Sequence, residues 1–185
     1  MAFLAALWLP IVLSTIIVFI ASSIMHAVLK YHQSDCHKFT NEGKVLEALR
    51  GEKLERGLYI FPFSAPKDMK SAAMVEKYKL GPVGMMTVMP SGPPFMPRFL
   101  GQWFGFCLVV SIFVGYLAWH TLSAGANYLA VFRVVGTAAF LVYGLGHLSD
   151  GIWKGQTWSM TIKEVIDGLV YGLLTAGMFG WLWPR

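Results

Sequence analysis

Four long runs of apolar residues, almost free of charge, limit what this chain can fold into. They cover residues 3–29, 99–121, 128–148 and 162–183. In a helix, which rises about 1.5 Å per residue, each run can cross a hydrocarbon core of roughly 30 Å. The sequence therefore predicts an all-α integral membrane protein, a four-transmembrane-helix bundle with helices at 1–29, 99–121, 128–148 and 162–183.

The composition supports this class, since 56% of the residues are apolar and only 14% are charged. An ordinary soluble domain carries far more charge. The first run has no basic residue before it and no small-x-small cleavage site, so we expect a retained helix rather than a secretory signal. Cys36 and Cys107 are the only cysteines, which excludes a disulfide framework and predicts two free thiols.

The basic residues predict the orientation. Of the 15 Lys and Arg residues, all except Arg133 and Arg185 lie in residues 30–98 or near the turn between the third and fourth runs. By the positive-inside rule, loop 30–98 is cytoplasmic and the N- and C-termini are outside, and we expect a bacterial cytoplasmic membrane. Acidic residues alternate with the basic ones, so the net charge of +5 suits anionic lipid headgroups and no nucleic acid partner is expected.

Loop 30–98 is predicted to form a small α+β or irregular cytoplasmic cap between the first two helices. Asn41 and Asp68 are residue types that favour the N-cap of a helix, and each is expected to start one. Each predicted helix is followed by a β-favouring run, 57–63 or 83–89, and the two runs could pair as a small hairpin-like unit or lie on the membrane.

Small residues recur every fourth position and form stripes on two of the helices. The stripes consist of Gly168, Gly172, Ala176 and Gly180 in the fourth run, and of Gly101 and Gly105 in the second. Small side chains let helix backbones approach closely in lipid. We expect them to pack inside the bundle, and self-association between copies is the alternative.

Polar side chains also follow helix faces, and unpaired polar groups are costly in hydrocarbon. The polar residues expected to be buried are Thr15, Ser22, Arg133, Glu164 and Tyr171. Asp167 is the most deeply placed acid. Its expected partners are His26, His147, Lys163 and Tyr171.

His26 and His147 lie on different helices at similar depth. They could be the axial ligands of a haem, or could join Asp150 and Asp167 around a metal ion. A proton relay through Asp167 is a further alternative. The sequence does not name a cofactor, and a hydrogen-bonded network that fixes the bundle is favoured over haem or metal.

A second group, His32, Cys36 and His37, follows the first run. Zinc would need a fourth ligand, for which the loop offers no spaced Cys/His pair. A structural or regulatory thiol at Cys36 is an equal alternative.

No catalytic residue is predicted. The leading hypothesis is a non-catalytic membrane subunit that docks in a larger membrane complex or self-assembles through its small-residue faces. Its expected partners are the lipid bilayer and other membrane subunits or copies of itself. The alternative is a small redox or metal/haem-binding membrane protein that uses the cytoplasmic-side His/Asp cluster.

Overall fold

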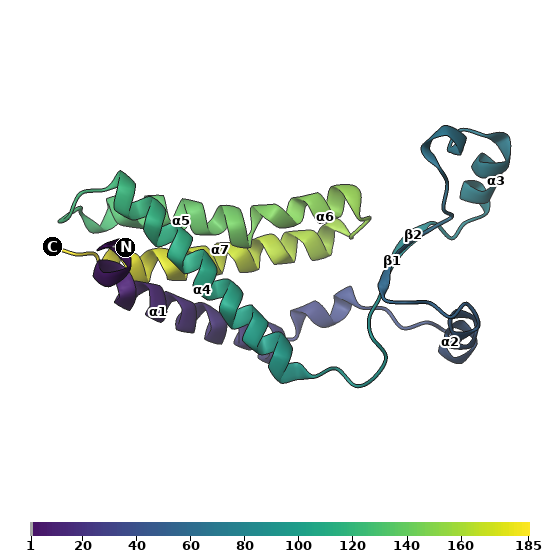
Figure 1. Cartoon of the computed structure of the whole chain (residues 1–185), viewed down its shortest axis with the longest axis horizontal. Helices are drawn as coiled ribbons and strands as arrows, with labels where there is room; N and C mark the ends of the chain where they lie inside the picture. Colours follow the sequence, from purple (N-terminus) through teal and green to yellow (C-terminus); the bar gives the residue numbers. More distant parts are fainter. Residues whose placement is uncertain (1) are drawn as a thin grey trace. The chain divides into compact units, whose positions relative to one another are not determined.

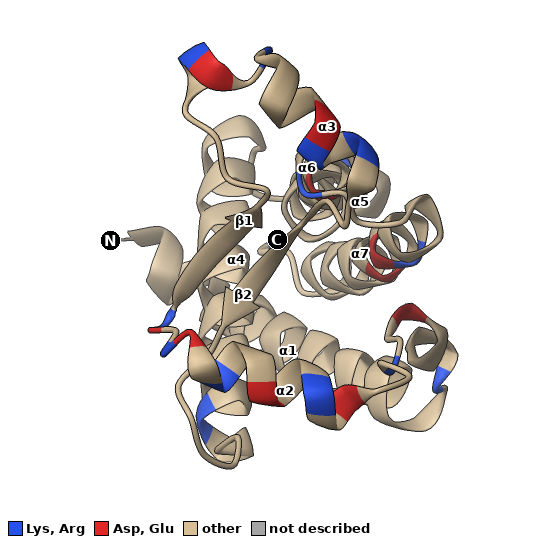
Figure 2. Cartoon of the chain, turned by 90° about the vertical axis from the view of Figure 1, so that its right-hand side faces the viewer, with Lys and Arg blue, Asp and Glu red and all other residues tan. Residues whose placement is uncertain are grey.

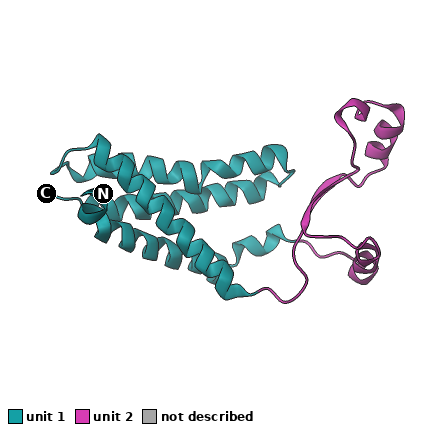
Figure 3. Cartoon of the chain, viewed as in Figure 1, with its two compact units in different colours: residues 1–36, 95–185 teal, residues 37–94 magenta. Residues whose placement is uncertain are grey.

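The computed structural model describes residues 2–185, of which 70% are helical, with one small two-stranded sheet. The chain divides into two compact units, residues 1–36 with 95–185 and residues 37–94 (Figure 3). Three helical stretches are long and apolar enough to cross a membrane, which indicates a membrane protein. They are Ala2–Val28, Met96–Thr121 and Tyr128–Trp153.

The first unit contains four long helices and several short helical turns. Its elements are α1 (Ala2–Ser23), the π-helical turn η1 (Ile24–Val28), the 3-10 turn η2 (Tyr31–Asp35), α4 (Met96–Thr121), α5 (Tyr128–Tyr143), the 3-10 turn η4 (Leu145–His147), α6 (Leu148–Trp153) and α7 (Trp158–Trp181). Helix α1 packs against α4 and α7, and α5 packs against the same two helices (Figure 1). The start of α1 and the C-terminus lie at the same end of this unit (Figure 1).

The core between these helices is mostly apolar. It includes the fully buried Leu7, Val18, Val131, Val135 and Phe179. Three buried hydroxyls interrupt it where α1 meets α4. The Ser14 and Thr15 hydroxyls lie 3.1 and 3.3 Å from that of Ser111, so each has a hydrogen-bond partner.

Helix α7 makes its closest contact with α5 through the predicted small-residue stripe. A Cβ atom on Gly168 would collide with the backbone of Gly144, and one on Gly172 would lie 3.2 Å from the Phe140 nitrogen. Ala176 is fully buried against Gly136 in the same contact. The two backbones therefore approach so closely that larger side chains do not fit.

The stripe on α4 is different. A Cβ atom on Gly101 or Gly105 would have no neighbour within 4 Å among the described residues. The expected close contact inside the bundle is therefore not made at these two glycines.

Arg133 is exposed, which corrects the prediction that it is buried. Helix α5 turns Val131, Val135, Ala139 and Tyr143 inward, at every fourth position. Arg133 is two residues from Val131, roughly 200° around the helix, and therefore lies on the opposite face.

The second unit contains two short helices and a two-stranded sheet. Its elements are α2 (Glu42–Gly51), β1 (Gly57–Phe61), the 3-10 turn η3 (Pro66–Asp68), α3 (Ala72–Leu80) and β2 (Gly84–Val88). The strands are antiparallel, with Gly57 opposite Val88, which confirms that the two β-favouring runs pair. Charged residues gather on α2 and α3, whereas α1 has none (Figure 2).

The helix starts in this unit differ from those predicted. Asn41 occupies the N-cap position of α2, but its side chain makes no capping hydrogen bond. Asp68 does not start α3, because it lies within the preceding 3-10 turn η3. The cap of α3 is Ser71, whose hydroxyl accepts a hydrogen bond from the Met74 N–H.

We predict that Gly168→Ala destabilises the protein, because its methyl group would force α5 and α7 apart. The expected loss lies at the upper end of the about 1–3 kcal/mol typical of overpacking. Gly101→Ala is the matched control. Its methyl group meets open space, and alanine favours a helix over glycine, so its stability should be equal to or slightly above that of the parent. Thermal unfolding in detergent measures both variants, and equal melting temperatures for them would contradict the packing argument.

Candidate metal centre

The end of α1 and the segment after it bring two histidines to α7. His26 lies in the π-helical turn η1, a type of turn often found at functional sites. Lys30 then adopts a left-handed conformation, with φ of 55°, which ends the helical path of η1 and redirects the chain into η2. As a result η2, which carries Tyr31 and His32, contacts α7.

Asp167 on α7 is the centre of the cluster, and its side chain is only 5% exposed. The Tyr31 hydroxyl donates a hydrogen bond to its Oδ1 atom. Its Oδ2 atom lies 2.9 Å from Nε2 of His32 and 3.8 Å from Nε2 of His26. One carboxylate oxygen is therefore anchored by Tyr31, and the other faces both imidazoles.

A second layer of contacts holds His32 in place. Its Nδ1 atom donates to Oδ2 of Asp35 at 2.8 Å, and Lys163 Nζ donates to Oδ1 of Asp35 at 2.5 Å. Lys163 also donates to the Tyr31 carbonyl oxygen at 2.9 Å. Lys163 thus ties η2 to α7, and Asp35 fixes the orientation of the His32 ring.

This environment shifts the pKa of three groups in η2. The Lys163 hydrogen bond, supported by that of His32, holds the pKa of Asp35 below its usual value. Burial alone would lower the pKa of His32, but the hydrogen bonds with Asp167 and Asp35 outweigh it and raise the pKa. Burial, together with the hydrogen bond to Asp167, raises the pKa of Tyr31. At neutral pH the Tyr31 hydroxyl therefore keeps its proton.

The hydrogen bonds of the two rings also determine where their lone pairs lie. Nδ1 of His26 is 3.0 Å from the Ser22 carbonyl oxygen, which can only accept, so this nitrogen carries the proton. Nδ1 of His32 is protonated for the same reason, since it donates to a carboxylate. In the neutral rings both Nε2 atoms are therefore acceptors. Together with Oδ2 of Asp167, three acceptor atoms lie within 4.8 Å of one another.

A single proton can be shared by only two of these three acceptor atoms. A proton on Nε2 of His32 makes an ion pair with Asp167, consistent with the raised pKa of His32. The His26 ring stacks on the His32 ring with centroids 4.6 Å apart, so a proton on His26 as well would place two cations in contact. Nε2 of His26 is left as an acceptor that faces a carboxylate oxygen. A bound cation would satisfy all three groups.

His147, Asp150 and Glu164 form a separate cluster. Nδ1 of His147 lies 3.3 Å from Oε2 of Glu164 and 3.8 Å from Oδ2 of Asp150. Lys154 is 2.7 Å from Asp150, and Gln156 donates to Glu164 at 2.5 Å, so both carboxylates already have donors. The need for an added cation is weaker here than at Asp167.

The four residues proposed from sequence as a haem or metal site are thus divided between two clusters, His26 with Asp167 and His147 with Asp150. Nε2 of His26 faces Asp167, and a haem iron held between His26 and His147 would require it to turn away. The geometry therefore favours a metal ion at Asp167 over a haem.

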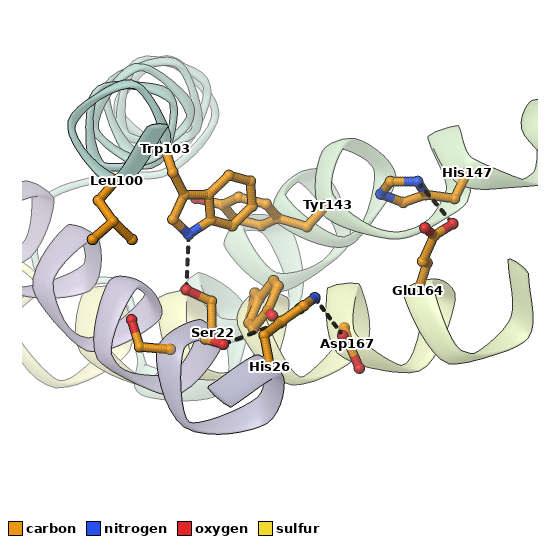
Figure 4. Close-up of a pocket in the computed structure, with 10 residues that line it drawn as sticks. Ser22, His26, Leu100, Trp103, Tyr143, His147, Glu164 and Asp167 are labelled. Atoms are coloured by element: carbon orange, nitrogen blue, oxygen red, sulfur yellow. Dashed lines mark hydrogen bonds and ion pairs between the residues drawn. The ribbon is translucent and has the colours of Figure 1, made fainter. Parts of the chain in front are cut away.

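A cavity of about 330 Å³ lies between the two clusters. Figure 4 shows His26 directed at Asp167, and His147 directed at Glu164, with Trp103 and Tyr143 nearby. The cavity lining includes His26, His147, Asp167, Trp103, Tyr143 and Tyr171. Because the His26 side chain is 55% exposed, the cluster at Asp167 is accessible.

Sequence reasoning missed the two closest partners of Asp167, Tyr31 and His32. The sequence grouped His32 with Cys36 and His37. Within residues 2–185, however, neither Cys36 nor His37 belongs to a cluster that could hold a metal ion. Of the four partners expected for Asp167, His26 approaches it, while Lys163 bonds to Asp35. A signal was present in the His-x-x-Asp spacing of His32 and Asp35, which places a carboxylate one turn from an imidazole.

Of the residues expected to be buried, Thr15, Ser22 and Tyr171 are buried, and Glu164 is partly buried. Ser22 has a specific role here. Its carbonyl oxygen binds His26, and its hydroxyl accepts a hydrogen bond from Nε1 of Trp103 at 2.8 Å.

We predict that His32 stabilises the metal-free protein most at mildly acidic pH. A raised pKa in the folded state gives stability that is fully present below the ordinary value of about 6.5 and is lost as the pH rises through the raised value. Asp35, whose pKa is lowered, stays ionised over this range. After EDTA treatment, the difference in melting temperature between the parent and His32→Gln should shrink as the pH rises above about 6.5. A difference that grows with pH would show that the His32 imidazolium does not stabilise the fold.

No protein-family model matches the sequence, and no curated protein or solved structure is similar to the chain. The chemistry of the chain's own residues is therefore the basis for a functional proposal.

Proposed function

We propose that this chain is a membrane protein of four transmembrane helices that binds a divalent transition-metal ion through His26, His32 and Asp167. The observation that carries the proposal is the cluster of three acceptor atoms, all within 4.8 Å of one another, of which a single proton satisfies only two. A cation coordinated by all three would remove the repulsion between the His26 lone pair and the carboxylate.

The spacing of the three atoms supports this proposal. Zinc binds histidine nitrogen and carboxylate oxygen at about 2.0–2.2 Å, so tetrahedral ligand atoms are about 3.4 Å apart. The distances from Asp167 Oδ2 to the two Nε2 atoms, 2.9 and 3.8 Å, lie on either side of this value. All three atoms lie within 4.8 Å of one another.

The surrounding residues resemble those of protein metal sites. Metal-binding histidines commonly donate their second ring N–H to a carboxylate or a backbone carbonyl. His32 donates to Asp35, and His26 donates to the Ser22 carbonyl. Tyr31 in turn anchors the Asp167 oxygen that would not bind the metal.

The ligand types narrow the choice of metal. Two imidazoles and one carboxylate suit Zn²⁺ or Fe²⁺, whereas Mg²⁺ and Ca²⁺ prefer oxygen ligands. Three protein ligands also leave at least one coordination position open, as in catalytic metal sites. The cavity beside His26 and Asp167 gives a small molecule access to such a position.

We also propose that α7 is the fourth transmembrane helix. It carries Lys163, Glu164 and Asp167 near its start, but each has a partner of opposite charge or a hydrogen-bond partner within the first unit. Its outward face is an exposed apolar stripe of Ile162, Ile166, Leu169 and Leu173. A stripe of this kind suits contact with lipid.

In this arrangement the termini are outside and residues 30–98 are cytoplasmic, because almost all Lys and Arg residues lie on that side. The metal site then lies near the cytoplasmic end of the helices. Metal ions would reach it from the cytoplasm.

Docking to another membrane subunit or to a second copy is a second candidate function. It is favoured by the small residues Gly101 and Gly105 on α4, which have no neighbour within the described chain. The stripe on α7 is used by α5 and does not support docking. The metal site is the better-supported function, because its atoms are already positioned.

We predict that the EDTA-stripped parent binds one Zn²⁺ per chain at this site, measured by calorimetry in detergent. Asp167→Asn and His26→Gln should each reduce the affinity by at least about 100-fold, because each removes or weakens a ligand. Asp35→Asn, which weakens the contacts of Asp35 with His32 and Lys163 but removes no metal ligand, should reduce it by about 10–100-fold.

His120→Gln is the control. His120 lies in the last turn of α4 and is not one of the residues of the cluster at Asp167. Its affinity for zinc should equal that of the parent. Tight binding that is unaffected by Asp167→Asn would contradict the proposed site.

A further inference from the structure

Tyr171 has a buried hydroxyl group that nothing in the described chain satisfies. The residue is 3% exposed, and its OH has no hydrogen-bond partner within residues 2–185. A buried polar group without a partner costs free energy and is uncommon in native proteins. Tyr171 also lines the cavity between the two clusters, so a molecule in the cavity could supply the missing partner.

Aromatic rings form much of the same cavity. The Tyr171 ring centroid lies 6.2 Å from that of Trp103 and 5.7 Å from that of Tyr143. The polar groups of the other two rings have partners, since Trp103 donates to Ser22 and the Tyr143 hydroxyl is directed at the Cys107 carbonyl oxygen. Among these three rings only Tyr171 offers a free donor.

We propose that this cavity binds a lipophilic single-ring molecule that carries a carbonyl or phenolic oxygen, the class that contains quinones and phenols. The ring packs against Trp103 and Tyr143, and its oxygen accepts a hydrogen bond from Tyr171. A volume of about 330 Å³ suits one ring. The proposal goes beyond the metal site and does not rest on it.

The charges around the cavity favour this class over an organic cation. Asp167 accepts hydrogen bonds from His32 and Tyr31, and Glu164 accepts one from Gln156. In the metal-free protein both carboxylates already have hydrogen-bond donors, so neither needs an ammonium group as a partner. The unmet requirement is a single acceptor for the Tyr171 hydroxyl.

The test is calorimetric binding of ubiquinone-1, a single-ring quinone with a short tail, to the full chain in detergent with EDTA. Saturable binding is expected. Tyr171→Phe removes only the hydroxyl and should weaken binding about tenfold, the effect of one buried hydrogen bond. Tyr116→Phe is the matched control, since Tyr116 is not among the residues that line the cavity. It also removes one tyrosine hydroxyl, but away from the cavity, and its affinity should stay within about twofold of the parent.

Thermal unfolding shows whether the variant folds. Without ligand, Tyr171→Phe should melt at or above the temperature of the parent, because it removes an unsatisfied polar group. Absence of saturable ubiquinone-1 binding, or equal affinity in the parent and Tyr171→Phe, would overturn the proposal. Saturable binding of tetraethylammonium in place of ubiquinone-1 would overturn it as well. Since EDTA is present throughout, failure here is distinct from failure of the metal site.

Discussion

The carboxylate of Asp167 is the group on which the arrangement of the first unit depends. A charged side chain within an apolar helix is costly, at least ~2.5 kcal/mol on insertion scales, unless it finds partners. Tyr31 and His32 supply them, and both come from the short segment after α1. The need to match one charge therefore fastens η2 to α7. The same contact brings His26 to the second oxygen of that carboxylate.

The close contact between α5 and α7 determines which way Asp167 faces. Gly168 and Gly172 lie against the backbone of α5, and at Gly168 even a methyl group would collide with it. This contact fixes the rotation of α7 about its axis. Asp167 and Tyr171, one turn apart on the adjoining face, are then directed into the space between α1, α4 and α5. The small residues thus serve the site by orienting the polar ones.

Much of this arrangement follows from sequence patterns, and the rest depends on the path of the backbone. The spacing of small residues by four identified the stripe on α7. The free-energy cost of an unpaired charge in lipid predicted that the Asp167 side chain faces the other helices. The left-handed residue Lys30, after which Tyr31 and His32 reach Asp167, leaves no periodic pattern in the sequence. Arg133 was misplaced because helical spacing shows which residues share a face, but not which face turns inward. The unpaired Tyr171 hydroxyl depends on side-chain contacts that no spacing predicts.

X-ray absorption at the zinc edge of the metal-loaded protein tests the proposed metal site most directly. The proposed ligands predict a shell of only nitrogen and oxygen atoms at about 2.0–2.2 Å, with the outer-shell scattering of two imidazole rings. A sulfur atom at about 2.3 Å would instead place the metal at Cys36 or Cys107. That result, or a shell without imidazole, would contradict a metal site at His26, His32 and Asp167.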